Sequence, residues 1–597
     1  MTSREITPSD FHLIVVGTGL QESLLAAGAA KAGKKVLHID TADFYGSHWA
    51  SHQLGFFEKW CRMHASSAGP LYSNAEVYKG HNADLGPSNE YNIDLAPKLV
   101  YSTGRLIDAL LGGAAQNYLD FKLLQKSYMW RDGQYRQVPA CRADVFKDST
   151  LGLLDKNALK SFLDKLEQHA KATQDEHKGS LWLDDRAFSE VLQEQRLNTQ
   201  LQETILYALA FADAAQAYER AGSSVSQRRA NKQNNRSRDL MSHAQGMEAL
   251  AQYRRSVKRY DEEIKGAGAF LLPVYGGGEL PQAFCRVAAV ADALYVLRQG
   301  IGKFVMDADT GLCQALLTSS GQELKASAFA GNPETLSQFC RAEAPAVAQT
   351  GLSRAVLILD APLVEDKSQV DKTTVKNIPD EIAQMHILVM LPPGVAGNAH
   401  PVRALQLGTA TACAPKDRYI VHLSTLQTAA TAREDLQQAA QSLADLSSLQ
   451  VSSSAAGAAE VSRGDDGHSH SAAEPQAASS SVTPAHAAQK NGAHDASEPP
   501  KKPRALFLAY YNQALTEDLH SSWELPQNVA LCGMPSPSVA YEDAVLEAEG
   551  LLEQLFPGLD ALFSCNAPAM DDESDEEAIE GMSEALDKAG EGDTDQP

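Results

Sequence analysis

The sequence predicts an α/β protein in which a Rossmann-type βαβ unit opens a domain of several sheets, with an all-helical second domain inserted into it. Three observations predict this arrangement. A strand–turn–helix–strand pattern runs from Phe11 to Asp40, apolar residues then follow helical spacing from about Asp144 to Leu272, and short strand-like segments return afterwards. The 597 residues, 44% hydrophobic and 21% charged, allow two or three domains with a large core.

The opening unit reads FHLIVVGTGLQESLLAAGAAKAGKKVLHID: a strand, a glycine turn, an Ala-rich helix with Gly33 near its end, and a second strand. The segment GTGLQE, Gly17 to Glu22, lies where a Rossmann fold binds a dinucleotide pyrophosphate. Asp40 ends the second strand, where a ribose-binding carboxylate would sit. This pattern keeps a flavin-dependent oxidoreductase open as one interpretation.

The third glycine of that motif is replaced by Glu22. In a working motif the helix N-terminus gives its amides and partial positive charge to phosphates. A glutamate competes for the helix end and would repel a pyrophosphate. We therefore favour an FAD-binding-like fold whose cofactor seat is occupied by protein: Gly17, Gly19, Glu22 and Asp40 form a degenerate motif, and no cofactor is expected.

The remaining segments follow in order. Helices are predicted at LLDKNALKSFLDKL, LQETILYALAFA and YEDAVLEAEGLLEQLF, and strands at LYVLRQGIGKFVMD, RAVLILD, QMHILVML, DRYIVHLST and ALFLAYYN. The predicted division is 1–144 for the first part of domain I, 145–270 for helical domain II, 271–444 for domain I continued, 445–504 for a disordered insertion, 505–565 for the last part of domain I, and 566–597 for an acidic disordered tail.

Charge and composition exclude several classes. The net charge is −24, to which residues 571–597 contribute 12 acids against one lysine, and this balance argues against a nucleic-acid binder. The local exception is a polar stretch that we interpret as a solvated loop, with Arg228, Arg229, Lys232, Arg236 and Arg238. Eight cysteines without CxxC spacing predict reduced core thiols. The insertion histidines lack a scaffold, so no metal site is expected: His468, His470, His486 and His494.

Targeting signals are also predicted to be absent. The start, MTSREITPSD, does not resemble a signal peptide, no apolar stretch approaches the length of a membrane span, and the end, DTDQP, carries no prenylation signal. KKPR, Lys501 to Arg504, fits a nuclear-localisation signal but is more commonly a linker end. We expect a cytosolic protein that meets membranes transiently.

Further motifs carry a family resemblance. GTGLQESLLAAGAAKAGKKVLHIDTADFYGSHWAS resembles the opening of Rab escort proteins and Rab GDP dissociation inhibitors. YNIDLAPKLVYSTGRLIDALL, YLDFK, VPACRADVF and PVYGGGELPQAFCR occur in the order of that family, and RAVLILD, DRYIVHLST and TAREDL follow. Trp49 in HWAS, the long insertion before ALFLAYYN, and LPQNVALC look like the escort branch, whereas Phe44 and Ser47 depart from the usual tyrosine and glycine around Tyr45.

The resemblance implies a non-catalytic protein. It would bind GDP-bound Rab GTPases, present them to the α/β dimer of Rab geranylgeranyltransferase, and carry the geranylgeranylated product to membranes. The alternative within the family is a dissociation inhibitor, which does not form the transferase complex. The inserted helical domain would shelter the lipid and contact the transferase, for which Tyr253 and Arg259 are candidates.

The resemblance also places a Rab-binding platform at Tyr45, Glu279, Gln282, Arg286 and Tyr295. Glu279 and Arg286 are seven residues apart, so they share one face if GELPQAFCR opens a helix. The plain alternative is a local ion pair on a solvated helix. Gly276, Gly277 and Gly278 would form the turn before this helix and permit close approach of a partner.

Overall fold

The computed structural model describes residues 5–67, 69–139, 152–174, 186–216, 240–259, 268–339, 351–364, 386–451, 502–516 and 523–559. The predicted βαβ unit is confirmed: parallel strands β1 (Asp10–Val16) and β2 (Val36–Ile39) flank helix α1 (Leu20–Lys31). Helix α1 stops two residues before Gly33, whose φ of +76° suits a residue without a Cβ atom.

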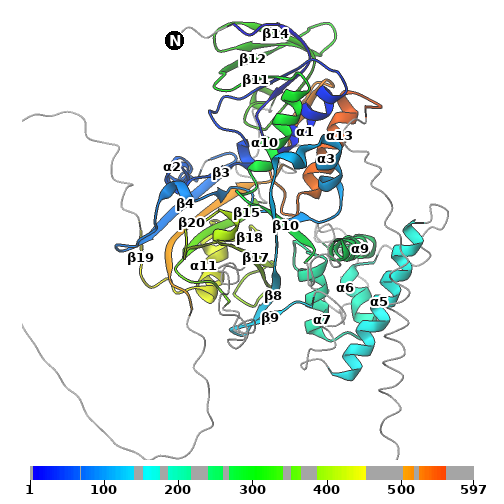
Figure 1. The fold of residues 1–597 in the computed structure, drawn as a ribbon, viewed down its shortest axis with the longest axis vertical. Helices are drawn as coiled ribbons and strands as arrows, with labels where there is room; N and C mark the ends of the chain where they lie inside the picture. The colour runs from blue at the N-terminus through cyan, green and yellow to red at the C-terminus, as the bar shows by residue number, and fades with distance from the viewer. Residues whose placement is uncertain are drawn as a thin grey trace, which may run out of the picture.

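The βαβ unit belongs to a seven-stranded sheet with the order β11-β2-β1-β14-β13-β12, in which β21 also pairs with β14 (Figure 1). Its other strands are β11 (Leu294–Val296), β12 (Ile301–Met306), β13 (Cys313–Thr318), β14 (Glu323–Gly331) and β21 (Val529–Leu531). Helix α1 is buried along most of its length and contacts α10 (Glu279–Val290) and α13 (Glu542–Leu555). The small side chains Ala26, Ala27 and Ala29 allow this close approach.

The second large sheet has nine strands in the order β19-β4-β20-β15-β18-β17-β16-β8-β9. They are β4 (Tyr72–Gly80), β8 (Lys126–Arg131), β9 (Gln134–Gln137), β15 (Gly351–Leu359), β16 (Ile387–Leu391), β17 (Val402–Leu407), β18 (Tyr419–Leu426), β19 (Leu449–Val451) and β20 (Ala505–Ala514). Alternate residues point to opposite faces. Ala355 and Leu357 pack with helix α11 (Ala432–Leu443), whereas Val356 and Ile358 share a core with α2 (Leu54–Met63).

The sequence boundary of the insertion was wrong at its start. Residues 445–451 fall inside the predicted disordered segment 445–504. However, β19 pairs antiparallel with β4, and the backbones of Asp445 and Arg504 form an isolated parallel β-bridge. Edge pairing with β4 supplies backbone hydrogen bonds, which the low apolar content of this stretch did not reveal. Several predicted segments lie outside the described residues. They are the basic cluster, the part of the insertion from 452 to 501 with its histidines, and the tail from 560.

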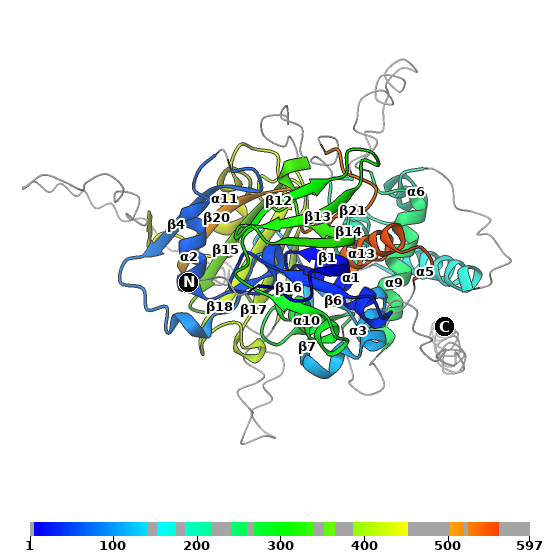
Figure 2. The same ribbon diagram turned by 90° about the horizontal axis from the view of Figure 1, so that it is seen from above.

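Between β9 and β10 the described residues are helical. The helices are α5 (Leu153–Gln174), α6 (Phe188–Glu194), α7 (Thr199–Glu203), the π-helix η4 (Thr204–Leu209) and α9 (His243–Lys258). Ser242 and Gln245 form a capping box that fixes the start of α9. These helices lie beside the body of the molecule (Figures 1 and 2) and share a core with it through Phe162, Phe188 and Met247.

Smaller elements join the large ones. A three-stranded sheet has the order β6-β10-β7, and β3 pairs with β5. The bounds are β3 (Ser51–His52), β5 (Ile93–Asp94), β6 (Val100–Tyr101), β7 (Phe121–Leu123), β10 (Phe270–Pro273), α3 (Arg105–Gly113) and the 3₁₀ turns η1 (Ser47–Trp49) and η3 (Ala115–Tyr118). Five of the eight cysteines are described, and each is buried and free, which confirms the thiol prediction for these five: Cys61, Cys285, Cys313, Cys413 and Cys532.

Candidate functional site

The glycine turn after β1 is filled by Glu22. Its Oε2 atom lies 2.5 Å from the position that a Cβ atom on Gly19 would take, and its Oε1 atom lies 3.1 Å from the corresponding position on Gly17. Glu22 is only 2% exposed, and burial raises its pKa to about 8. The carboxyl group is therefore mainly protonated at pH 7. It excludes a pyrophosphate by occupying the space, which corrects the charge repulsion expected from the sequence.

Neighbouring side chains close the same helix end. Trp49 Nε1 donates to Gln21 Oε1 at 3.0 Å, and Gln21 Nε2 donates to Glu547 Oε2 at 3.0 Å. The ring of Trp49 lies 5.8 Å from that of Tyr541, measured between centroids. The first turn of α1 is thus covered by η1 and α13.

Asp40 is also used internally. It is 5% exposed, and it accepts hydrogen bonds from Thr18 Oγ1 at 2.7 Å, the Ala42 amide at 2.8 Å and Ser47 Oγ at 3.3 Å. These donors hold the loop after β2 and engage both carboxylate oxygens of Asp40. The residues present do not fit a dinucleotide.

The buried Glu22 predicts a pH dependence. Its pKa is near 8 in the folded chain and 4.5 ordinarily, so between these values the folded state binds a proton that the unfolded state has lost. Stability should therefore fall as pH rises through this window, by up to about 1.4 kcal/mol per pH unit. Glu22→Gln, a neutral mimic, should remove this component. Urea unfolding measures this. From pH 5.5 to 7.0, the free energy of unfolding of Glu22→Gln, relative to that of the native chain, should rise by about 2 kcal/mol.

The exposed glutamate Glu90 provides the control for this experiment. Glu90→Gln should follow the native pH curve. A Glu22→Gln curve parallel to the native one would show that Glu22 is ionised in the folded chain.

A buried histidine connects the glycine turn to Tyr295. His38 Nε2 donates to the Gly17 carbonyl oxygen, which leaves Nδ1 to accept from Tyr295 Oη at 2.8 Å. Burial lowers the pKa of His38 to about 4, so the ring is neutral. The Tyr295 ring lies 6.4 Å from the Tyr45 ring between centroids, so the structure brings these two predicted platform residues together. Sequence reasoning missed His38.

Helix α10 carries the other three predicted platform residues. It begins at Glu279, as GELPQAFCR predicted, and presents Gln282 and Arg286 outward, while Leu280 and Phe284 are buried. Glu279 Oε2 accepts from the Tyr275 amide at 3.0 Å, and Gln282 Nε2 donates to the Gly278 carbonyl oxygen at 3.1 Å. Both side chains therefore brace the start of the helix.

Among the described residues, Arg286 forms no ion pair with Glu279. Its guanidinium lies over the ring of Tyr118, 5.1 Å from the centroid, which is a cation–π contact. Tyr118 is 41% exposed and Tyr275 is 53% exposed. Tyrosine and arginine are the side chains most often found as binding anchors. We define the platform as the five predicted residues together with Tyr118 and Tyr275, which sequence reasoning had not singled out although Tyr118 opens the YLDFK motif.

The three glycines before α10 face the chain itself. The Gly277 amide donates to Asp94 Oδ1 at 3.0 Å and the Gly278 amide to Ser51 Oγ at 2.8 Å. A Cβ atom on Gly277 would lie 2.3 Å from Tyr541 Oη. The glycines do form the predicted turn, but the close approach that they permit is to β3, β5 and α13. The prediction that they admit a partner was therefore wrong.

The two candidates for the transferase contact differ in burial: Tyr253 lies within α9 and Arg259 follows its last residue. The half-buried ring of Tyr253 packs near Phe211 and Phe270, at 6.2 and 6.0 Å between centroids. Arg259 is exposed at the end of the helix. Tyr253 is thus part of the seam between the helices and β10, and only Arg259 lies outward.

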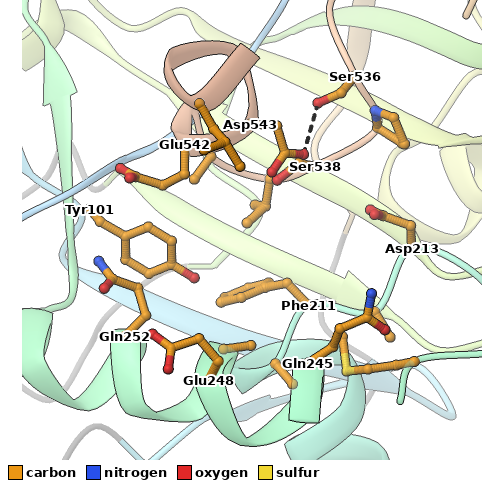
Figure 3. Close-up of a pocket in the computed structure, with 18 of the residues that line it drawn as sticks. Tyr101, Phe211, Asp213, Gln245, Glu248, Gln252, Ser536, Ser538, Glu542 and Asp543 are labelled. Carbon is orange, nitrogen blue, oxygen red and sulfur yellow. Dashed lines mark hydrogen bonds between the residues drawn. The ribbon is translucent and has the colours of Figure 1, made fainter. Parts of the chain in front are cut away.

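A cleft of about 1390 Å³ lies between the helical segment and the body (Figure 3). Tyr101 and Phe211 line it, with Gln252 and Glu248 of α9 on one side and Glu542 and Asp543 of α13 on the other. Burial raises the pKa of Glu542 to about 7. The lining of the cleft holds seven acidic residues but only two arginines, so its charged side chains are mainly acidic.

The described ranges hold neither a cluster of metal ligands nor a membrane-spanning helix. No three His, Cys, Asp or Glu side chains gather there as metal ligands do, and none of the helices there is long and apolar enough to cross a bilayer.

Comparison with known proteins gives consistent matches. The family model of the GDP dissociation inhibitors matches residues 7–452. Rab escort protein 1 of Arabidopsis thaliana is 31% identical, over 70% of this chain and 77% of that protein. Rab proteins geranylgeranyltransferase component A 1 of Rattus norvegicus is 24% identical, over 94% of this chain and 92% of that protein.

Two further matches concern inhibitors. The Rab GDP-dissociation inhibitor of Saccharomyces cerevisiae is 26% identical, over 71% of this chain and 81% of that protein. The crystal structure of Rab GDI from Plasmodium falciparum superposes with a TM-score of 0.58 at 15% identity, covering 92% of this chain and 98% of that one. At this identity the structural likeness concerns the fold.

Proposed function

Because this chain belongs to the GDP dissociation inhibitor family, we propose that it binds GDP-bound Rab GTPases and presents them to Rab geranylgeranyltransferase for C-terminal prenylation. It then delivers the prenylated Rab to membranes. The observation that carries the proposal is the outward face of α10, which holds Glu279, Gln282 and Arg286, with the Arg286 guanidinium over the Tyr118 ring. These residues belong to YLDFK and PVYGGGELPQAFCR, the segments that resemble the family. In this role the chain is an accessory component, and the transferase supplies the chemistry.

The geometry suits a protein partner. Tyr45 and Tyr295 approach each other, Tyr118 is exposed beside Arg286, and Tyr275 is exposed beside Glu279. Rings and a guanidinium that are already held by internal contacts lose little conformational entropy on binding. The internal bonds of Glu279, Gln282 and Tyr295 thus make the platform a preorganised surface.

We propose that the helical segment shelters the geranylgeranyl group. Each CH₂ removed from water contributes about 0.8 kcal/mol, so a twenty-carbon chain needs an apolar shelter. The helices enclose apolar side chains around Phe162, Phe188 and Met247, and the Gly246 backbone packs directly on Phe188, so they must separate to admit a lipid. The cleft beside α9 has seven acidic residues in its lining, so we propose the core between the helices as the shelter rather than this cleft.

The dissociation inhibitors are the second candidate, because the yeast inhibitor also matches. Two matches favour the escort function: the Arabidopsis escort relative is 31% identical, against 26% for the yeast inhibitor at similar coverage, and the rat component A relative matches 94% of this chain.

Complex formation with the transferase distinguishes the two candidates. Purified chain, GDP-loaded unprenylated Rab and the transferase α/β dimer are expected to elute together in gel filtration. Unprenylated Rab loaded with a GTP analogue is the control and should enter the complex less. Elution of the chain with Rab but never with the transferase would instead identify an inhibitor.

A further inference from the structure

A second cavity, of about 980 Å³, lies next to the filled dinucleotide seat. Its wall includes Asp40, which follows β2, and Asn332, which follows β14. These positions are at the carboxyl ends of parallel strands in the seven-stranded sheet, and small molecules bind in open α/β sheets at that edge. The opposite wall comes from α2, β4 and the end of β20.

Aromatic side chains dominate one part of this wall. Trp60 and Tyr72 meet edge to face at 4.8 Å between ring centroids, His48 lies 5.7 Å from Tyr72, and Phe44 lies 5.1 Å from His52. No lysine or arginine belongs to the lining, and its two acidic residues are Asp40 and Glu334. The cavity lining therefore offers aromatic side chains but no cation to hold a phosphate or carboxylate.

Several polar atoms of lining residues have no hydrogen-bond partner in the described part of the chain. They are His48 Nε2, His52 Nε2 and Tyr72 Oη, on side chains that are 9%, 5% and 4% exposed, and Trp523 Nε1. Buried polar groups are normally paired, and those left over are often completed by water or a ligand. Burial also lowers the pKa of His48 and His52 to about 4, so both rings are neutral.

We propose that this cavity binds a neutral, planar heteroaromatic compound, which stacks on the aromatic wall and pairs with the buried histidine and tyrosine groups. Aromatic walls with a few convergent polar groups are the usual make-up of such sites. A phosphate would meet no cation in the lining, and an unpaired charge is unfavourable in a buried site. The site is independent of the platform and of the proposed escort function.

Riboflavin is a suitable probe because it is a neutral three-ring heteroaromatic compound, and FMN differs from it by one phosphate group. Titration of the full chain, followed by riboflavin fluorescence, is expected to show saturable binding at one site. FMN should bind at least about tenfold more weakly. Tyr72→Phe removes only the hydroxyl group and should weaken riboflavin binding by about three- to tenfold.

Tyr541→Phe is the matched control, since Tyr541 also has a buried, unpartnered hydroxyl but lies outside this cavity. It should bind riboflavin as the native chain does. His52→Phe is a second variant in case Tyr72→Phe melts at a lower temperature. The proposal is overturned if riboflavin does not saturate, if FMN binds as tightly, or if the control loses as much affinity. Rab binding by the same variants should be unchanged, which separates this result from failure of the escort proposal.

Discussion

Arg286→Glu is expected to lower the affinity of the chain for GDP-bound Rab by at least about 30-fold, the effect of losing an interface anchor worth 2 kcal/mol or more. The guanidinium is exposed on α10 and is held over Tyr118, so the variant loses the anchor and the cation–π contact and gains a negative charge in their place. Isothermal titration calorimetry with GDP-loaded Rab measures the change.

Arg433→Glu is the matched control for this variant. Arg433, on α11, also lies over a tyrosine, with its guanidinium 5.5 Å from the centroid of Tyr78, a residue of the nine-stranded sheet, and it is exposed. It should keep native Rab affinity. Equal losses in both variants would mean that the effect is general electrostatics, and native affinity in Arg286→Glu would remove α10 from the interface.

Arg403→Ala is expected to destabilise the chain by about 3 kcal/mol and to loosen the helical segment. Arg403, on β17, donates to the Pro537 carbonyl oxygen at 2.5 Å and to that of Phe211 at 3.0 Å, and it forms an ion pair with Asp213. Breaking a buried ion pair costs about 3–5 kcal/mol. We expect the lower end because the Asp213 side chain is 34% exposed. Urea unfolding measures the loss.

Hydrogen exchange locates the same effect. Amides of η4 and α9 should lose protection in Arg403→Ala before those of the nine-stranded sheet, because the variant frees the segment that joins helices and body. Arg418→Ala is the control: Arg418 also donates to a remote backbone carbonyl oxygen and pairs with an aspartate, in this case both of Asp84, whose side chain is exposed. Uniform loss of protection across the chain would show that Arg403 does not specifically join the two parts.

Local patterns predicted much of this molecule. The run from Phe11 to Asp40 predicted β1, α1 and β2, because strand and helix periods depend on neighbouring residues. The start of α10 at Glu279 followed from its glycine turn in the same way. Glu22 in place of glycine also predicted a closed cofactor seat, although not that the carboxyl group would be neutral.

Contacts between distant segments could not be predicted in this way. His38 and Tyr295 are 257 residues apart, and Arg286 reaches back to Tyr118, so neither pair leaves a signal in its own neighbourhood. LYVLRQGIGKFVMD read as one strand-like stretch, yet it forms β11 and β12 at opposite edges of one sheet. The glycines before α10 were assigned to a partner because their internal neighbours, Ser51, Asp94 and Tyr541, are remote in sequence.

Lipid transfer to Rab tests the central claim most directly. The measurement is the initial rate of incorporation of labelled geranylgeranyl diphosphate into GDP-loaded Rab by the transferase α/β dimer, with and without this chain. We predict that incorporation depends strongly on the chain and falls with Arg286→Glu but not with Arg433→Glu. Incorporation at the same rate without the chain, or Rab that binds the chain but is not prenylated, would contradict the escort function.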